Sequence, residues 1–120
     1  MAYSGPERRR HPRVRANFIV SYRVLEDQDN VDTSQTKNLS LGGMLVTTNR
    51  CFEKGTTLAL KIRLPFDLSP IEVVGKVVES CEIVKDLIYD TRIEFSSINQ
   101  RHQGVMSQTV DYYLKKKGKS

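Results

Sequence analysis

Arginine is concentrated near the start of the chain. Five arginines lie within eight residues: Arg8, Arg9, Arg10, Arg13 and Arg15. Three residues separate Arg9 from Arg13, so two long cationic side chains can converge on one ligand. The planar guanidinium group binds phosphate oxygens, and it also binds the O6 and N7 atoms of guanine through two parallel hydrogen bonds. The stretch therefore indicates a guanine nucleotide with phosphates as its first candidate ligand.

Short basic runs have other common explanations, namely solvated tails, localisation signals and non-specific nucleic-acid patches. A second polar segment, about 25 residues after the arginines, makes a binding site the better explanation. In it, Asn38 offers both an acceptor and a donor, Ser40 can do either, and Gly43 lets a ligand approach the backbone. Without the arginines, an ordinary polar turn bonded to its own backbone would be the better explanation.

Together the two segments resemble the PilZ domain, a bacterial receptor for cyclic di-GMP. That family carries an RxxxR motif followed by a [D/N]xSxxG motif. The matching residues here are Arg9, Arg13, Asn38, Ser40 and Gly43. The order and spacing of the two motifs, with predicted strands between them, make the pair fairly specific, and the resemblance covers nearly the whole chain.

The resemblance implies a role for each arginine. Arg9 and Arg13 would bind guanine and phosphate, and Arg10, inside the motif, would be a further contact. Arg8 stands just before the motif. In family members with arginine there, the ligand tends to bind as an intercalated pair, which implies two cyclic di-GMP molecules per site. Asn38 replaces the aspartate of many members and gives up a negatively charged acceptor for guanine.

Hydrophobic periodicity indicates that β-strands carry these segments. The clearest strand is 56–64, where Leu58, Leu60 and Ile62 alternate with less apolar residues. Alternation or strand-compatible composition predicts further strands at 17–25, 31–39, 44–48, 71–81 and 87–95. About six short strands joined by polar turns predict an antiparallel β-barrel, because closure removes exposed strand edges.

Three features around the last strands refine this prediction. Gly75 lies inside a strand and predicts a bulge or bend. Arg92 stands where PilZ domains often have glycine, so it would either crowd the barrel or point to solvent. Ser96 or Ser97 is expected to cap a terminal helix. The helix carries a mostly apolar stripe that would lie against the barrel, made of Val105, Met106, Thr109, Val110, Tyr113 and Leu114.

The length of 120 residues predicts one domain. We expect a flexible arm with the arginine motif at 1–16, a β-barrel at 17–96, a helix at 97–115 and a basic tail at 116–120. These would form one PilZ domain over about 7–115. The resemblance implies the same fold class, all-β with a C-terminal helix, in which one helix caps a six-stranded antiparallel β-barrel.

Charge and motif content narrow the function classes. The net charge of +5 sits at the two ends of the chain, which favours a local cationic clamp over a nucleic-acid-binding face. The two cysteines and two histidines show no zinc spacing, and no nucleophile–base pair is recognisable. The sequence has neither an apolar run long enough to span a membrane nor a signal segment. We therefore expect no enzymatic activity, no metal, no cofactor, no transmembrane segment and a cytoplasmic location.

The leading hypothesis is a bacterial cyclic di-GMP receptor and adaptor. Ligand binding would order the arginine arm and create a surface for an unidentified downstream protein. One alternative is a small basic barrel that binds single-stranded nucleic acid, but such sites need aromatic stacking platforms. The residues Phe18, Tyr22, Tyr89 and Phe95 fall on the predicted core faces. The other alternative is a PilZ-like protein-interaction module without a ligand.

Overall fold

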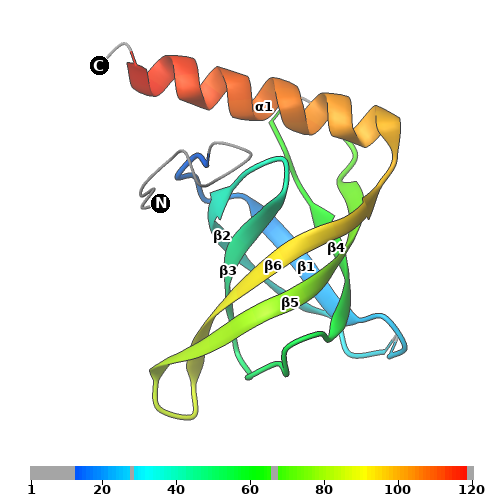
Figure 1. The fold of residues 1–120 in the computed structure, drawn as a ribbon, viewed down its shortest axis with the longest axis vertical. Helices are drawn as coiled ribbons and strands as arrows, with labels where there is room; N and C mark the ends of the chain where they lie inside the picture. Colours follow the sequence, from blue (N-terminus) through cyan, green and yellow to red (C-terminus); the bar gives the residue numbers. More distant parts are fainter. Residues whose placement is uncertain (1–12, 28, 66–67, 119–120) are drawn as a thin grey trace, which may run out of the picture.

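The computed structural model describes residues 13–27, 29–65 and 68–118. Within them, six strands precede one helix (Figure 1). The strands are β1 (Ile19–Val24), β2 (Asp32–Leu39), β3 (Gly43–Thr48), β4 (Thr57–Ile62), β5 (Ile71–Val84) and β6 (Ile88–Ile98). The helix is α1 (Gln100–Gly118).

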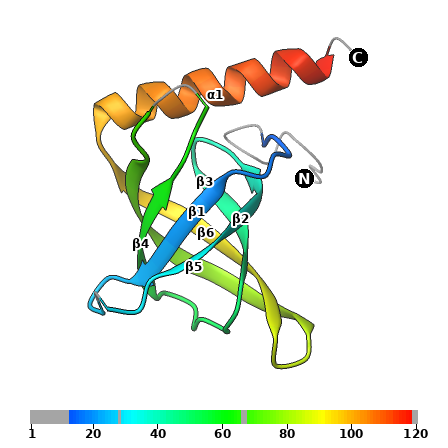
Figure 2. The same cartoon turned by 180° about the vertical axis from the view of Figure 1, so that it is seen from behind.

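The strands form a closed antiparallel barrel in the order β1-β2-β3-β6-β5-β4. Two pairings between strands distant in sequence close it. Strand β1 pairs with β4, with Val20 opposite Ile62, and β3 pairs with β6, with Met44 opposite Ile93. Figures 1 and 2 show the barrel from opposite sides, with α1 across one end. The predicted fold class, a six-stranded antiparallel barrel with one C-terminal helix, is confirmed.

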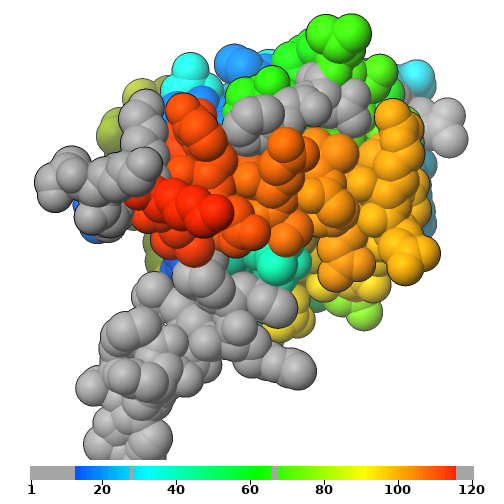
Figure 3. Space-filling model, turned by 90° about the horizontal axis from the view of Figure 1, so that it is seen from above, coloured from blue at the N-terminus to red at the C-terminus, as the bar shows by residue number. Residues whose placement is uncertain are grey.

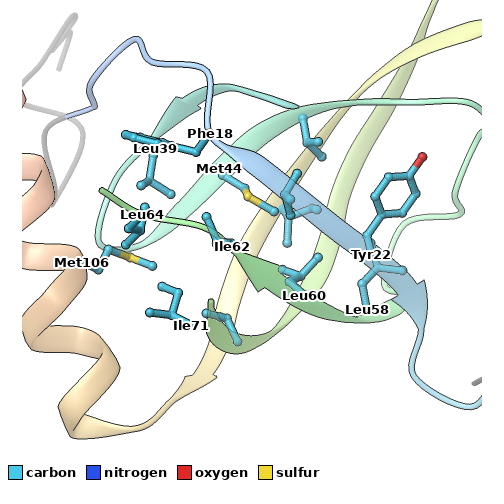
Figure 4. Packing of buried hydrophobic residues seen from close by; sticks show 14 of the residues in the cluster. Phe18, Tyr22, Leu39, Met44, Leu58, Leu60, Ile62, Leu64, Ile71 and Met106 are labelled. Carbon is cyan, nitrogen blue, oxygen red and sulfur yellow. The ribbon is translucent and has the colours of Figure 1, made fainter. Parts of the chain in front are cut away.

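Alternating apolar residues fill the barrel. In β4, Leu58, Leu60 and Ile62 are almost completely buried, as the period of two predicts. Figure 4 shows that these side chains point into the barrel from its wall. At the end of the barrel, Met106 of α1 points toward Leu64 and the neighbouring core, and it is fully buried.

Helix α1 covers one end of the barrel, as the view from above shows (Figure 3). Its predicted apolar stripe is the face that packs, since Met106 and Val110 are buried and Tyr113 is partly buried against the core. The ring of Phe18 meets that of Tyr113 edge to face, with centroids 5.4 Å apart. This contact ties the C-terminal half of the helix to the segment before β1.

The expected helix cap is wrong. Ser96 and Ser97 both lie in β6, where pairing with β5 continues, and Ser96 donates its hydroxyl to the Val74 carbonyl at 3.1 Å. The cap is Asn99, whose side-chain oxygen accepts a 2.9 Å hydrogen bond from the backbone N–H of His102. Asparagine caps helices as well as serine does, so strand pairing decided which residue took the role.

Gly75 marks a bulge, as predicted. The register between β5 and β6 shifts between Val74 and Gly75, and a β-carbon at Gly75 would lie 2.6 Å from the Ile93 side chain. Strand β5 pairs with β4 only from Ile71 to Lys76. Beyond that point β5 and β6 continue together as a hairpin that projects away from the helix-covered end (Figure 1).

Candidate functional site

An open cleft of about 290 Å³ lies on the outer face of the barrel. Strands β2, β3, β5 and β6 and the segment before β1 all contribute to it. Its lining comprises Arg13, Asn38, Ser40, Gly42, Gly43, Met44, Leu45, Val78, Arg92, Ile93 and Glu94. The cleft thus brings together four predicted site residues, namely Arg13, Asn38, Ser40 and Gly43. The other three, Arg8, Arg9 and Arg10, lie outside the described residues.

A short backbone bridge places Arg13 beside the second motif. Val14 and Leu39 exchange two backbone hydrogen bonds, each 2.9 Å long, and both side chains are buried in the core. Arg13 precedes one partner and Asn38 precedes the other, so residues 25 positions apart in the sequence meet at one cleft. The segment from Arg13 to Ala16, which the sequence assigned to the arm, is therefore held against β2 in this structure.

Ser40 shapes the turn between β2 and β3. Its hydroxyl oxygen accepts hydrogen bonds from the N–H groups of Gly42 at 3.1 Å and Gly43 at 3.2 Å, and it donates to the Gly43 carbonyl at 3.3 Å. The side chain is nearly buried. A hydroxyl offers one donor and two acceptor sites, so these contacts use its whole capacity. Ser40 therefore organises the backbone that lines the cleft, as an ordinary polar turn does.

Gly43 is required by the approach of two strands. It opens β3 opposite Glu94 of β6, and a β-carbon at this position would collide with the carbonyl oxygen of Ile93. The missing side chain was expected to let a ligand approach the backbone. The structure gives a reason internal to the barrel, because only glycine lets β3 and β6 pack this closely at the rim of the cleft.

Asn38 differs from its two motif partners. It is half-buried at the end of β2 and lines the cleft. Within the described residues, no hydrogen bond engages its side chain, whereas the Ser40 hydroxyl is fully engaged. The Asn38 amide therefore has its oxygen and its NH2 available for a bound molecule.

Strand β6 adds charged residues to the cleft that neither motif contains. Arg92 and Glu94 line it from β6. Arg92 is exposed on the outer face and approaches Glu79 of β5 at 3.6 Å, so it points to solvent and does not crowd the barrel. Both residues face outward, since the burial of side chains alternates along this part of β6. Their place at the cleft depends on the pairing of β3 with β6, which no local pattern reveals.

Among the described residues, no group of three or more His, Cys, Asp or Glu side chains could hold a metal ion. No helix among them is long and apolar enough to cross a membrane.

Comparison with known families shows which family the chain belongs to. The family model of the PilZ domain matches residues 7–112. The chain belongs to the PilZ domain family. The resemblance seen in the motifs is thereby confirmed, and the cleft of this PilZ chain contains the described residues of both motifs.

Solved PilZ structures share the fold. The Bacillus subtilis inhibitor of motility (MotI/DgrA) superposes with a TM-score of 0.74 at 22% identity, over 93% of this chain and 52% of its own. The PilZ domain of Escherichia coli YcgR, solved with c-di-GMP, gives 0.66 at 14% identity, over 91% and 93%. The K. pneumonia MrkH–c-di-GMP complex gives 0.69 at 19% identity, over 93% and 55%. The chain thus spans about half the length of MotI and MrkH, and no curated protein matches it in sequence.

Proposed function

We propose that this PilZ chain is a non-catalytic receptor that binds cyclic di-GMP in the cleft over β2, β3 and β6. The observation that supports this most directly is the convergence of the motifs. Arg13 lies 25 positions before Asn38 in the chain, yet it lines one cleft with Asn38 and the Ser40 turn. Support also comes from two structural relatives, the YcgR PilZ domain and MrkH, whose structures contain c-di-GMP.

The residues of the cleft match the chemistry of the ligand. Cyclic di-GMP carries two guanines and two phosphates, so it needs cations, planar donors and polar acceptors. Arg13 offers a charged fork for phosphate or for the guanine O6/N7 edge. Asn38 offers an amide to the N1 and N2 hydrogens of guanine. Ser40 and Gly43 act through the shape of the turn, since the Ser40 hydroxyl already bonds the turn's own backbone.

The proposal includes the arginines before the described residues. Arg9 would act with Arg13, and Arg10 would add a further contact. Arg8, just before the motif, is the basis for proposing two ligand molecules per site. Ligand binding would draw this arm onto the barrel and create a surface that an unidentified partner protein recognises. The division into an arm at 1–16, a barrel, a helix and a basic tail stays a prediction.

Calorimetric titration with cyclic di-GMP, beside GMP and GTP, tests the proposal. We expect saturable binding of cyclic di-GMP alone and a stoichiometry near two. Arg13→Ala should weaken binding by tenfold or more, since a charge-assisted contact contributes roughly 1.5–3 kcal/mol. Arg23→Ala is the matched control, because Arg23 is a β1 arginine outside the cleft. A stoichiometry near one would remove the two-molecule inference drawn from Arg8.

Two alternatives predict different titrations. A nucleic-acid-binding barrel needs exposed aromatic rings, but Phe18 and Tyr22 are buried, and Tyr89 and Phe95 are only partly exposed. It would bind any oligonucleotide with a steep salt dependence. A protein-interaction module without a ligand would bind neither class of molecule. An absence of cyclic di-GMP binding at low salt would overturn our proposal and favour that module.

A further inference from the structure

Arg92 is a cleft cation that belongs to neither motif. It lies in a row of four outward-facing residues that crosses four neighbouring strands. Asn38 of β2 pairs with Leu45 of β3, Leu45 pairs with Arg92 of β6, and Arg92 pairs with Glu79 of β5. Cross-strand partners lie on the same face of a sheet, and strands are spaced about 4.8 Å apart. Arg92 therefore stands roughly 10 Å from Asn38, with one leucine between them.

Glu79 holds Arg92 on the side of the row away from Asn38. The Arg92 Nη1 atom lies 3.6 Å from Glu79 Oε1, and about half of each side chain is exposed. The other carboxylate oxygen of Glu79 accepts a hydrogen bond from the Cys81 thiol, with 3.0 Å between Sγ and Oε2. An exposed pair at this distance is weak, because water screens it and both side chains lose freedom. Arg92 can therefore leave Glu79 at little cost.

A phosphate in the cleft would compete well with Glu79. Arginine and phosphate form two parallel charge-assisted hydrogen bonds, which are shorter and stronger than a single long contact to a carboxylate. The row also provides a path, because the Arg92 side chain needs only to swing across Leu45 toward Asn38. Among the described lining residues, only Arg13 and Arg92 are cationic, and the carboxylate of Glu94 lies on the same wall.

We propose that Arg92 is an additional ligand-binding residue that contacts a phosphate of cyclic di-GMP, and that Glu79 restrains it in the free protein. The inference rests on the proposed function and deepens it. Binding exchanges the Glu79–Arg92 contact for a phosphate–Arg92 contact, so Glu79 opposes binding and Arg92 favours it. Arg92 thus raises the affinity for cyclic di-GMP, and Glu79 lowers it.

Calorimetric titration of four proteins with cyclic di-GMP tests this assignment. Arg92→Ala should bind about tenfold more weakly than wild type, which corresponds to one lost charge-assisted contact. Arg92→Lys should keep part of the affinity, because lysine retains the charge but loses the planar fork. Glu79→Gln should bind about two- to threefold more tightly, since a weak exposed pair is removed. A lysine variant as weak as the alanine variant would overturn the phosphate contact.

A double-mutant cycle separates restraint of Arg92 from a general effect of charge. In the Arg92→Ala background, Glu79→Gln should leave the affinity unchanged, because there is no longer an arginine to release. Glu72→Gln is the matched control, since Glu72 is an exposed β5 glutamate outside the cleft. The proposal that Glu79 restrains Arg92 is wrong if Glu79→Gln strengthens binding equally with and without Arg92. It is also wrong if Glu79→Gln strengthens binding no more than Glu72→Gln does.

The outcomes also separate this inference from the proposed function. If wild type does not bind cyclic di-GMP, the receptor assignment itself fails. If wild type binds, Arg13→Ala weakens binding and Arg92→Ala binds like wild type, only the role of Arg92 fails. Because Arg92 and Glu79 are both about half exposed, their variants should fold with unchanged melting temperatures, which a thermal scan of each protein checks.

Discussion

Thr36 Oγ1 donates a 2.8 Å hydrogen bond to the carbonyl oxygen of Ala16. The same hydroxyl oxygen accepts a 3.0 Å bond from the backbone N–H of Phe18, and the threonine is completely buried. Asn17 adds a side-chain bond to the Thr36 carbonyl at 2.9 Å. One threonine in β2 thus fixes three consecutive residues of the segment that leads from Arg13 into β1.

Replacing Thr36 with valine should loosen this segment. The change keeps the side-chain shape but leaves the Ala16 carbonyl and the Phe18 N–H without their partner, which costs about 1–3 kcal/mol per buried group. We expect lower stability in urea denaturation and several-fold weaker ligand binding, because Arg13 lies only three positions before Ala16. Thr36→Ser keeps the hydroxyl and should recover most of both losses. Equal ligand affinity in all three proteins would show that the Thr36 hydroxyl does not position Arg13.

Gly43 and Gly104 should respond oppositely to alanine. A β-carbon at Gly43 would collide with the Ile93 carbonyl oxygen, whereas nothing lies within 4 Å of the corresponding position at Gly104. Gly43→Ala should therefore destabilise the barrel by about 1–3 kcal/mol. Gly104→Ala should stabilise the protein by up to about 1 kcal/mol, since Gly104 is exposed within α1. Urea denaturation of both variants checks the signs, and a neutral Gly43→Ala would contradict the close strand approach.

Substitution of Ser40 should lower the stability of the protein, whereas substitution of Asn38 should lower its affinity for the ligand. Ser40→Ala removes a buried hydroxyl that satisfies two backbone N–H groups of the turn, so stability should fall by about 1–3 kcal/mol. Asn38→Ala removes an amide that has no partner within the described residues, so stability should change by less than about 0.5 kcal/mol. Its cost should appear in calorimetry as roughly tenfold weaker cyclic di-GMP binding. The reverse pattern would contradict the roles assigned to the two side chains.

The pKa of the Cys81 thiol depends on its contact with Glu79. Its hydrogen bond to the Glu79 carboxylate raises the pKa of Cys81 above the ordinary cysteine value, because the bond stabilises the protonated thiol and the carboxylate repels the thiolate. Glu79→Gln should lower this pKa, increase the thiolate fraction near about pH 8 and speed alkylation by iodoacetamide. The measurement uses Cys51→Ser in both proteins, so that Cys81 is the remaining cysteine. An unchanged alkylation rate would show that Glu79 does not control the thiol.

Met106 should anchor the helix to the barrel. It is fully buried between α1 and the core, so Met106→Ala should cost about 2–5 kcal/mol through lost burial and a residual cavity. Gln108 lies on the exposed side of the same helix, and Gln108→Ala should leave stability within about 0.5 kcal/mol. Comparison of the two urea midpoints tests whether α1 is a structural lid. A small loss at Met106 would contradict close packing of the helix on the barrel.

Much of the local structure could be predicted from the sequence. The alternation of Leu58, Leu60 and Ile62 predicted a strand that the structure confirms, because burial of one face imposes a period of two on any strand in a barrel wall. The stripe containing Met106 and Val110 predicted the packing face of the helix, because burial of one face imposes a helical period on the apolar residues. Gly75 predicted the bulge, and the two motifs identified the PilZ family.

Element ends and the composition of the cleft could not be predicted in this way. Asn99 caps the helix where a serine was expected, because pairing of β6 with β5 extends the strand past both serines. Arg92 and Glu94 join the cleft because β6 pairs with β3, whose nearest residue is 40 positions or more away in the sequence. Periodicity depends on neighbours along the chain, whereas the pairing that closes a barrel depends on contacts between distant strands. The sequence by itself therefore determined the strands, the packing face of the helix and the motifs, and the tertiary structure alone decided which charged residues surround them.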